Sequence, residues 1–198
     1  MIVEVKHLTL AQLEAGLEEI CQSPRTEGLL EMIVRRPCTG ERDVLNEGLL
    51  DLAEGLVGDS WSTRNRSRNS ASPSFRDMQL TLMNSRVIAL VAQEKTRWPL
   101  AGDQLFIDFD LSGENAPAGT HLGVGSAIIE VTAPPHTGCK KFMARFGLEA
   151  LNFVNSPIGR RLNLRGINAK VVQPGVIRVH DFVKRYPKPV LACAAKLL

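Results

Sequence analysis

The sequence predicts a mainly β fold with peripheral α-helices, of the mixed barrel or sandwich type. Predicted strands outnumber predicted helices and cluster from residue 78 onward. Helices of roughly 10–15 residues do not alternate regularly with strands, which disfavours a doubly wound parallel sheet. The 198-residue length suits one domain or at most two small ones, and 44% apolar with 23% charged residues is typical of globular proteins. We expect a single domain over residues 1–198.

The N-terminal part begins with an amphipathic helix. Thr9 and Gln12 have the spacing of a capping box, and leucines follow at helical spacing until Ser23-Pro24 ends the run. Residues 29–36 read as a buried strand that ends before a proline. Residues 45–56 carry apolar side chains at positions 45, 49, 52, 53 and 56, which predicts a second helix weakened by two glycines. A Gly-Asp turn follows at 58–59.

The remaining chain alternates strand, turn and helix signals. Residues 60–76 hold six serines, four arginines and no acid, which indicates either a flexible loop or an arginine loop that orders on a phosphate-bearing ligand. Residues 132–139 contain two prolines and are predicted as a rigid loop at a strand end. Strands are expected at 78–83, 105–111, 121–131 and, as a hairpin around Pro174-Gly175, 168–172 with 176–179; helices are expected at 85–91, 142–154 and 191–198.

Charge is distributed unevenly along the chain. Residues 1–59 carry a net charge of −7, residues 60–133 a net charge of 0, and residues 134–198 a net charge of +10. The basic third is either a solvated face that balances the acidic N-terminal part, or a site for an anion such as phosphate, nucleic acid or an oxyanion.

The sequence offers no membrane or secretion signal. The longest aliphatic run, Val87 to Ala92, is far short of the roughly 20 residues that span a bilayer. The first residues include an acid and lack the basic-then-apolar layout of a signal peptide. We therefore expect a cytoplasmic protein without membrane partners.

Among the four cysteines, Cys139 has the most reactive surroundings. The cysteines form no C-x-x-C pair, so a structural zinc site is disfavoured and free thiols are expected. Cys21 and Cys193 are expected in the core. Cys139 follows a Pro-Pro-His-Thr-Gly run and precedes Lys140-Lys141, so at a helix N-terminus the dipole and the cations favour a thiolate. Such a thiolate serves as a nucleophile, a persulfide carrier or a soft metal ligand; the alternative is a small buried cysteine.

Four segments carry the motifs of a known domain family. They are AGDQLFIDFDLS (101–112), APAGT (116–120), LGVGSAIIEVTAPPHTGCKKFMARFG (122–147) and RGINAKVVQPGVIRVHD (165–181). The single cysteine after Glu-Val-Thr, the Arg145-Phe146-Gly147 run and Arg165-Gly166 match in order and spacing. Residues 101–181 therefore resemble a MOSC domain, found at the C-terminus of molybdenum cofactor sulfurases and in small stand-alone bacterial proteins.

The resemblance implies a MOSC-type β-barrel and a function. The family's cysteine carries sulfur as a persulfide or ligates molybdenum held by a pyranopterin, and members with bound cofactor reduce N-hydroxylated compounds. Here Cys139 would be the catalytic residue and the metal ligand. The cofactor phosphate would be held by Arg165 with Arg145 and either Arg35 or Arg36. Thr137 and Gly138 would donate hydrogen bonds near the metal; the alternative is that they only shape the loop. His136 would orient substrate or move a proton; the alternative is a turn histidine that faces solvent.

Two departures from the family pattern affect specificity. Many stand-alone members carry a His-Gly-Gly-type motif after the Gly-Asp turn, where this chain has residues 62–80. The hairpin usually closes with Gly-Asp, whereas this chain reads His180-Asp181.

The partners and rival functions follow from the same residues. The expected cofactor is molybdopterin-bound molybdenum, and the sequence leaves open whether it stays bound during purification. A length of 198 residues has no room for the pyridoxal-phosphate desulfurase domain of the sulfurases, so a separate cysteine desulfurase or electron-donor protein is expected. The rivals are a metal-free sulfur carrier, a structural protein, and a nucleic-acid-binding module; the last is disfavoured by an aromatic content of 5%.

Overall fold

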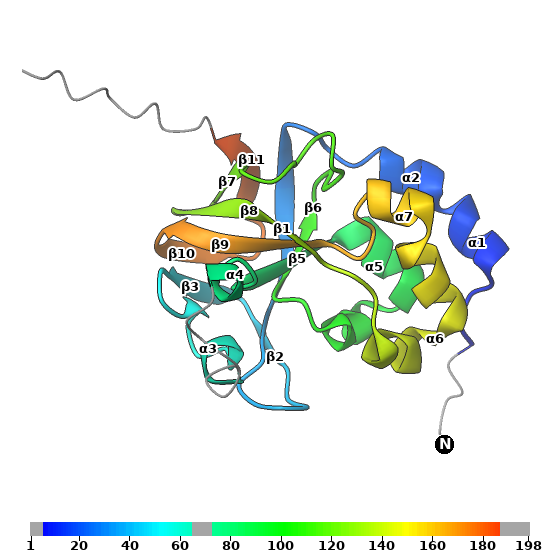
Figure 1. Cartoon of the computed structure of the whole chain (residues 1–198), viewed down its shortest axis with the longest axis horizontal. Coiled ribbons are helices and arrows are strands. Elements are labelled where there is room, and N and C mark those ends of the chain that lie inside the picture. Colours follow the sequence, from blue (N-terminus) through cyan, green and yellow to red (C-terminus); the bar gives the residue numbers. More distant parts are fainter. Residues whose placement is uncertain (1–5, 65–72, 187–198) are drawn as a thin grey trace, which may run out of the picture.

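Strands form a closed barrel in which the last strand pairs with the first (Figure 1). The computed structural model describes residues 6–64 and 73–186. Within them, barrel neighbours are antiparallel except for the parallel pair β5 and β6, and Glu27 of β1 lies opposite Lys184 of β11. In order around the barrel the strands are β1 (Glu27–Arg35), β6 (Leu105–Asp108), β5 (Leu80–Asn84), β9 (Ile167–Gln173), β8 (Ala127–Pro135), β7 (His121–Val124) and β11 (Phe182–Tyr186). The predicted fold class, mainly β with peripheral helices, is confirmed.

Side-chain alternation along the strands produces two cores. In β6, Leu105 and Ile107 face the barrel interior, while Phe106 between them joins a second cluster under the helices. The same alternation separates Leu82 from Met83 in β5. The barrel therefore has an apolar inside and, on one side, an apolar outside that the helices cover.

Helices cover one side of the barrel (Figure 1). Their apolar side chains complete the second cluster, to which Leu13, Val87 and three phenylalanines of the longest helix contribute. The helices on this side are α1 (Leu10–Ala15), α2 (Leu17–Cys21), α5 (Ser85–Ala92), the 3₁₀ helix η1 (Lys95–Ala101), α6 (Lys140–Asn155) and α7 (Pro157–Arg161). In the part of the chain that the structure describes, no helix has the length and apolar composition needed to cross a bilayer.

Two helix starts follow the sequence prediction. Thr9 accepts a hydrogen bond from the Gln12 backbone, and the Gln12 side chain accepts one from the Thr9 backbone, so the capping box is confirmed. Asn84 caps α5 by accepting from the backbone N–H groups of Arg86 and Val87. The first predicted helix is divided into α1 and α2 at Gly16.

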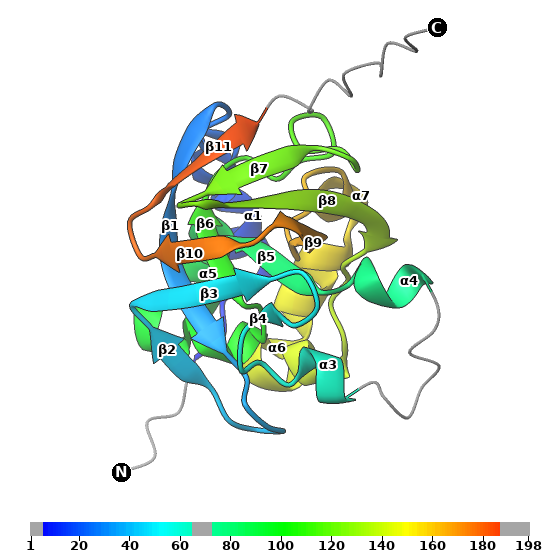
Figure 2. The same cartoon turned by 90° about the vertical axis from the view of Figure 1, so that its left-hand side faces the viewer.

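The predicted helix over residues 45–56 is wrong, because this stretch is β-structure. Its first residue ends β2 (Asp43–Leu45), which pairs with β1 and extends the large sheet. The rest of the stretch forms β3 (Glu47–Asp51) and β4 (Gly55–Leu56). Gly55 has a φ of +75°, which a helix does not allow, and the Asp51 carboxylate accepts from two following backbone N–H groups to make a turn. Strands β3 and β4 form a small sheet with β10 (Gly175–Arg178), on the side of the barrel turned away from α1 and α6 (Figure 2).

Three C-terminal predictions need correction. Residues 121–131 are two strands, β7 and β8, that turn at Gly125, where φ is +55°. The loop predicted at 132–139 is partly strand, because β8 continues to Pro135. The hairpin predicted around Pro174-Gly175 does not pair with itself: β9 stays in the barrel, whereas β10 pairs with β3.

Two predicted segments lie wholly or partly outside the described residues. The arginine-rich stretch over 60–76 contains α3 (Trp61–Arg64) and α4 (Pro73–Arg76), whose Trp61 and Phe75 rings stack at 4.3 Å. Residues 65–72 within it and the helix predicted at 191–198 are not among the residues that the structure describes.

Candidate functional site

Four consecutive carbonyl oxygens at the end of η1 each accept a hydrogen bond from a different arginine. A helix C-terminus leaves its last carbonyls without helical partners and with partial negative charge, so cations are stabilised there. We call these four side chains the arginine cluster. The pairs are Arg42 Nε with Pro99 (3.3 Å), Arg145 Nη1 with Leu100, Arg165 Nη2 with Ala101 (3.0 Å) and Arg36 Nη1 with Gly102 (2.7 Å).

A buried carboxylate follows directly after these carbonyls. Asp103 is completely buried, and it accepts from Arg165 Nη1 at 2.7 Å and from His136 Nε2 at 2.9 Å. Burial alone would raise the pKa of Asp103, but the Arg165 charge and the hydrogen bonds of His136 and Arg165 hold that pKa well below its ordinary value. Asp103 is therefore an ionised acceptor within the core.

The Asp103 carboxylate fixes the tautomer of His136. Burial, the Arg165 charge and, more weakly, the Arg36 charge lower the pKa of His136 below its ordinary value, although Asp103 opposes this. An ionised carboxylate only accepts, so Nε2 of the neutral ring carries the proton. Nδ1 is then left as a hydrogen-bond acceptor on a side chain that is 18% exposed.

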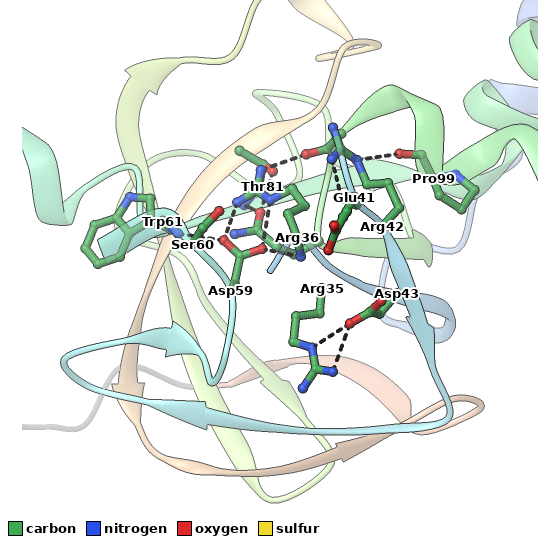
Figure 3. Close-up of polar contacts among 12 residues, drawn as sticks. Arg35, Arg36, Glu41, Arg42, Asp43, Asp59, Ser60, Trp61, Thr81 and Pro99 are labelled. Atoms are coloured by element: carbon green, nitrogen blue, oxygen red, sulfur yellow. Dashed lines mark hydrogen bonds and ion pairs between the residues drawn. The ribbon is translucent and has the colours of Figure 1, made fainter. Parts of the chain in front are cut away.

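Arg36 and Arg35 point to different places, although they are neighbours in sequence (Figure 3). Arg36 makes a buried two-point pair with Asp59 at 2.8 and 2.9 Å, and its third nitrogen reaches Gly102. Arg35 pairs instead with Asp43 at 2.9 Å, where its side chain is 37% exposed. Of the two, the structure brings Arg36 into the arginine cluster.

Cys139 is exposed at the start of α6. It is the N-cap residue, its backbone is extended, and its side chain makes no capping hydrogen bond. Phe142, three residues on and so on the same helix face, lies under the Arg165 guanidinium at 5.0 Å. The first turn of α6, which Cys139 caps, thus lies against Arg165.

The residues between His136 and Cys139 are held against the second half of α6. The Gly138 N–H donates to Asn155 Oδ1 at 2.9 Å, and the Asn155 amide returns a hydrogen bond to the Gly138 carbonyl at 3.3 Å. Thr137 is exposed. The helix can fold back to this point because Gly147, with φ at +90°, kinks α6.

Of the two cysteines expected in the core, one is exposed and the other lies outside the described residues. Cys21, expected in the core, is exposed on α2, and Cys38 is exposed after β1. Cys193 is not among the described residues.

Two small cavities meet at His136. One, of about 160 Å³, is lined by His136, Arg165, Asn155 and Arg160 among others. The other, of about 190 Å³, shares Pro135, His136 and Asn163 with the first.

Sequence reasoning missed Arg42 and Asp103. Asp103 and Gln104 form a polar pair directly before a strand, and both are completely buried. A polar pair at a strand start is too common to predict burial. The partner of Asp103, Arg165, is distant in sequence, so one sequence gives no sign of the pairing.

The site's chemistry fits an anionic cofactor with a soft metal. Cys139 offers an exposed sulfur, and Arg165 Nε is a buried donor with no hydrogen-bond partner in the described part of the chain. A Cβ on Gly102 would lie 3.8 Å from Arg42 Nη2 and 3.9 Å from Arg145 Nη1, so both guanidiniums flank this glycine. The described residues contain no group of three His, Cys, Asp or Glu side chains placed to hold a metal ion by themselves.

Comparisons with known proteins show the fold. No family model and no curated protein matches the chain. The structure of YuaD from Bacillus subtilis matches with a TM-score of 0.58 at 15% identity, over 81% of this chain and 97% of that chain. YiiM from Geobacillus stearothermophilus matches with a TM-score of 0.56 at 14% identity, over 84% of this chain and 78% of that chain. YiiM from Escherichia coli matches with a TM-score of 0.51 at 17% identity, over 81% of this chain and 70% of that chain. The chain thus has the barrel fold of YiiM and YuaD.

Proposed function

We propose that this chain binds the molybdenum cofactor through the Cys139 thiolate and acts as a molybdenum-dependent reductase of N-hydroxylated compounds. In this proposal it works in the cytoplasm with a separate electron-donor protein. Support comes from the MOSC-like motifs and from the barrel fold shared with YiiM and YuaD. The observation that carries the proposal is one exposed thiol at the N-cap of α6, three residues after His136, which hydrogen-bonds to the buried Asp103–Arg165 pair.

Cys139 has the right chemistry for the metal. Thiolate sulfur is a soft ligand that suits a redox-active transition metal. The proposed cofactor brings its metal already held by a pyranopterin, so it requires only one ligand from the protein. The exposure of Cys139 leaves room for a bulky partner at the sulfur.

The cofactor phosphate matches the remaining donors of the arginine cluster. In the described part of the chain, Arg145 spends only Nη1 on a protein carbonyl, so Nε and Nη2 remain for a ligand. Arg165 keeps its buried Nε. Arg36 is mostly committed to Asp59 and Gly102, so it positions the η1 carbonyls. Charge-assisted hydrogen bonds from Arg145 and Arg165 would hold the phosphate.

The reaction needs protons as well as electrons. The bound cofactor supplies a centre that passes electrons to the substrate. Reduction of R–NHOH breaks the N–O bond, takes two electrons from the donor protein and two protons, and gives R–NH₂ and water. Within this scheme His136 holds or moves a proton at Nδ1, because Nε2 is committed to Asp103.

Metal content tests the proposal directly. Wild-type protein made in cells that produce the cofactor should contain molybdenum near one equivalent, and Cys139→Ala should lose it. Cys21→Ala is the matched control, because Cys21 is also exposed but lies on α2. Equal, negligible metal in all three proteins contradicts the proposal.

A sulfur-carrier function is the second candidate, and the exposed sulfur of Cys139 favours it. The Cys139 thiolate would attack the outer sulfur of a desulfurase persulfide. A new S–S bond forms on Cys139, the donor's S–S bond breaks, and the donor leaves as its thiolate. Desulfurase-dependent mass gain of one sulfur in metal-free wild type, absent in Cys139→Ala, would support this function over the first.

A further inference from the structure

The cavity of about 160 Å³ between the end of β8, α6 and α7 has two arginines, a histidine and two asparagines among its lining residues. We propose that it binds a small protonated oxyanion, of which inorganic phosphate is the best match. We call it the oxyanion cavity. The cavity shares His136 and Arg165 with the proposed cofactor site but does not include Cys139, so phosphate and the cofactor would compete for these two side chains. The inference itself rests on the cavity and not on bound molybdenum.

The size of the cavity excludes larger ligands. Sites for drug-sized molecules measure roughly 300–1,000 Å³. At about 160 Å³, the oxyanion cavity suits a five-atom anion with some water and is too small to enclose a pterin.

The lining provides positive charge without a competing carboxylate. Arg160 and Arg165 line the cavity, and no Asp or Glu side chain is among its described lining residues. Among the described residues, Arg160 bonds only through Nε, to the Asn155 carbonyl at 3.1 Å, which leaves its two terminal nitrogens for a ligand. The exposed Thr137 adds a hydroxyl at the rim.

A buried donor without a partner points to a ligand. The Arg165 side chain is only 6% exposed, and its Nε finds no acceptor among the described residues. Leaving such a group unsatisfied is costly, so an acceptor atom is expected within its reach. An anion oxygen in the cavity would provide that acceptor.

The His136 ring selects among anions of the same size. Its Nε2–H is committed to Asp103, so Nδ1 is a lone-pair acceptor in a ring that lines the cavity. An acceptor favours an oxyanion that carries a proton and repels one that carries none. Phosphate keeps a proton at neutral pH, whereas sulfate, equally tetrahedral, does not.

Binding of the two ions to wild type and two arginine variants tests the proposal. Calorimetry and the ¹⁵N signals of the His136 ring should show phosphate binding, with sulfate at least tenfold weaker. Arg160→Gln should weaken phosphate binding by about tenfold or more through loss of charge-assisted hydrogen bonds. Arg161→Gln is the matched control, because the next residue of α7 lines a different cavity and should change binding less than twofold.

The remaining outcomes separate this proposal from its neighbours. Phosphate binding that persists in both Cys139→Ala and Arg145→Gln assigns the ion to the oxyanion cavity and not to the proposed cofactor site, whichever way the metal test falls. Loss of phosphate binding in Arg145→Gln would assign the ion to the cofactor site and overturn the proposal. Equal affinity for phosphate and sulfate, equal effects of the two arginine substitutions, or an unperturbed His136 ring overturns the proposal. Glycerol phosphate binding as tightly as inorganic phosphate overturns the assignment to a free ion.

Discussion

His136 donates from Nε2 to Oδ1 of the completely buried Asp103 at 2.9 Å, and Arg165 donates to the other oxygen of the same carboxylate at 2.7 Å. One acid thus neutralises a buried arginine and orients a histidine. The carboxylate lies between the η1 carbonyls and the strand β6, so it links the barrel to the candidate site.

Removal of Asp103 should be strongly destabilising. Asp103→Ala leaves the Arg165 charge buried and unpaired, and we expect the free energy of unfolding to fall by about 3–5 kcal/mol. Asp43→Ala is the control, because its pair with Arg35 is well exposed and such pairs contribute about 1 kcal/mol or less. Urea denaturation measures both. Similar losses in the two variants would show that the Asp103 charge is not isolated from water.

Stability should fall as the pH drops below about 6.5, through His136. Its pKa is lowered in the folded protein from the ordinary 6.5, so the unfolded chain takes up the proton first. The contribution of His136 to the free energy of unfolding is therefore present above pH 6.5 and decreases as the pH falls toward the pKa of His136 in the folded protein. Denaturation between pH 7.5 and 5.5 should show a smaller slope for His136→Gln than for wild type. An unchanged slope would mean that the histidine stays equally basic in both states.

Asp103 adds a second loss of stability at lower pH. Its folded pKa lies below the ordinary 3.8, so its contribution is present above that value and is lost as the pH falls further. Acid unfolding of wild type below pH 4 should be steeper than that of Asp103→Asn. Equal steepness argues against an ionised Asp103.

A methyl group at Gly166 should disrupt the barrel. Its φ is +105°, and a Cβ there would lie 2.1 Å from the Leu82 carbonyl oxygen in β5. We expect Gly166→Ala to lower the free energy of unfolding by several times the roughly 1–2 kcal/mol that a left-handed conformation alone costs. Gly40→Ala is the control, because Gly40 has a φ of +95° with no atom within 4 Å of its Cβ position. Thermal unfolding of both variants separates the clash from the backbone strain.

Arg145 should matter for retention of the proposed cofactor. Loss of its charge-assisted hydrogen bonds to a phosphate costs about 1.5–3 kcal/mol, which is roughly tenfold to a hundredfold in affinity. Arg145→Gln should therefore lose most bound pterin through dialysis, measured by fluorescence of the oxidised pterin. Arg185→Gln, an exposed change on β11, should keep it. Equal retention would remove Arg145 from the cofactor site.

Local signals predicted the parts of the fold that local interactions determine. The capping box at Thr9 and the start of the helix at residue 85 depend on residues within one turn, and both were found as predicted. The helix predicted over residues 45–56 was wrong because their apolar spacing coincided with a helix period, whereas pairing with β10 decides their structure. The sheet partner lies more than a hundred residues away and leaves no trace in the local pattern.

The same reasoning applies to the candidate site. Cys139 and Arg165 were identified from motifs. In the structure the Arg165 guanidinium lies over the ring of Phe142, which is three residues after Cys139. Arg35 ends β1 and pairs with Asp43, whereas Arg36 follows the strand and pairs with Asp59, so the partners of the two side chains decide which one joins the arginine cluster. The carbonyls of η1 were invisible to sequence reasoning, because backbone acceptors carry no residue signature.

Closure of the barrel by β11 has a consequence for synthesis and folding. Glu27 meets Lys184, so the ring cannot close until almost all of the described chain has left the ribosome. Contacts between such distant segments have a high loop-closure cost, which slows folding. Until then β1 presents an open edge to other nascent chains, a hazard for aggregation. A chain truncated before β11 should accumulate as insoluble protein for this reason.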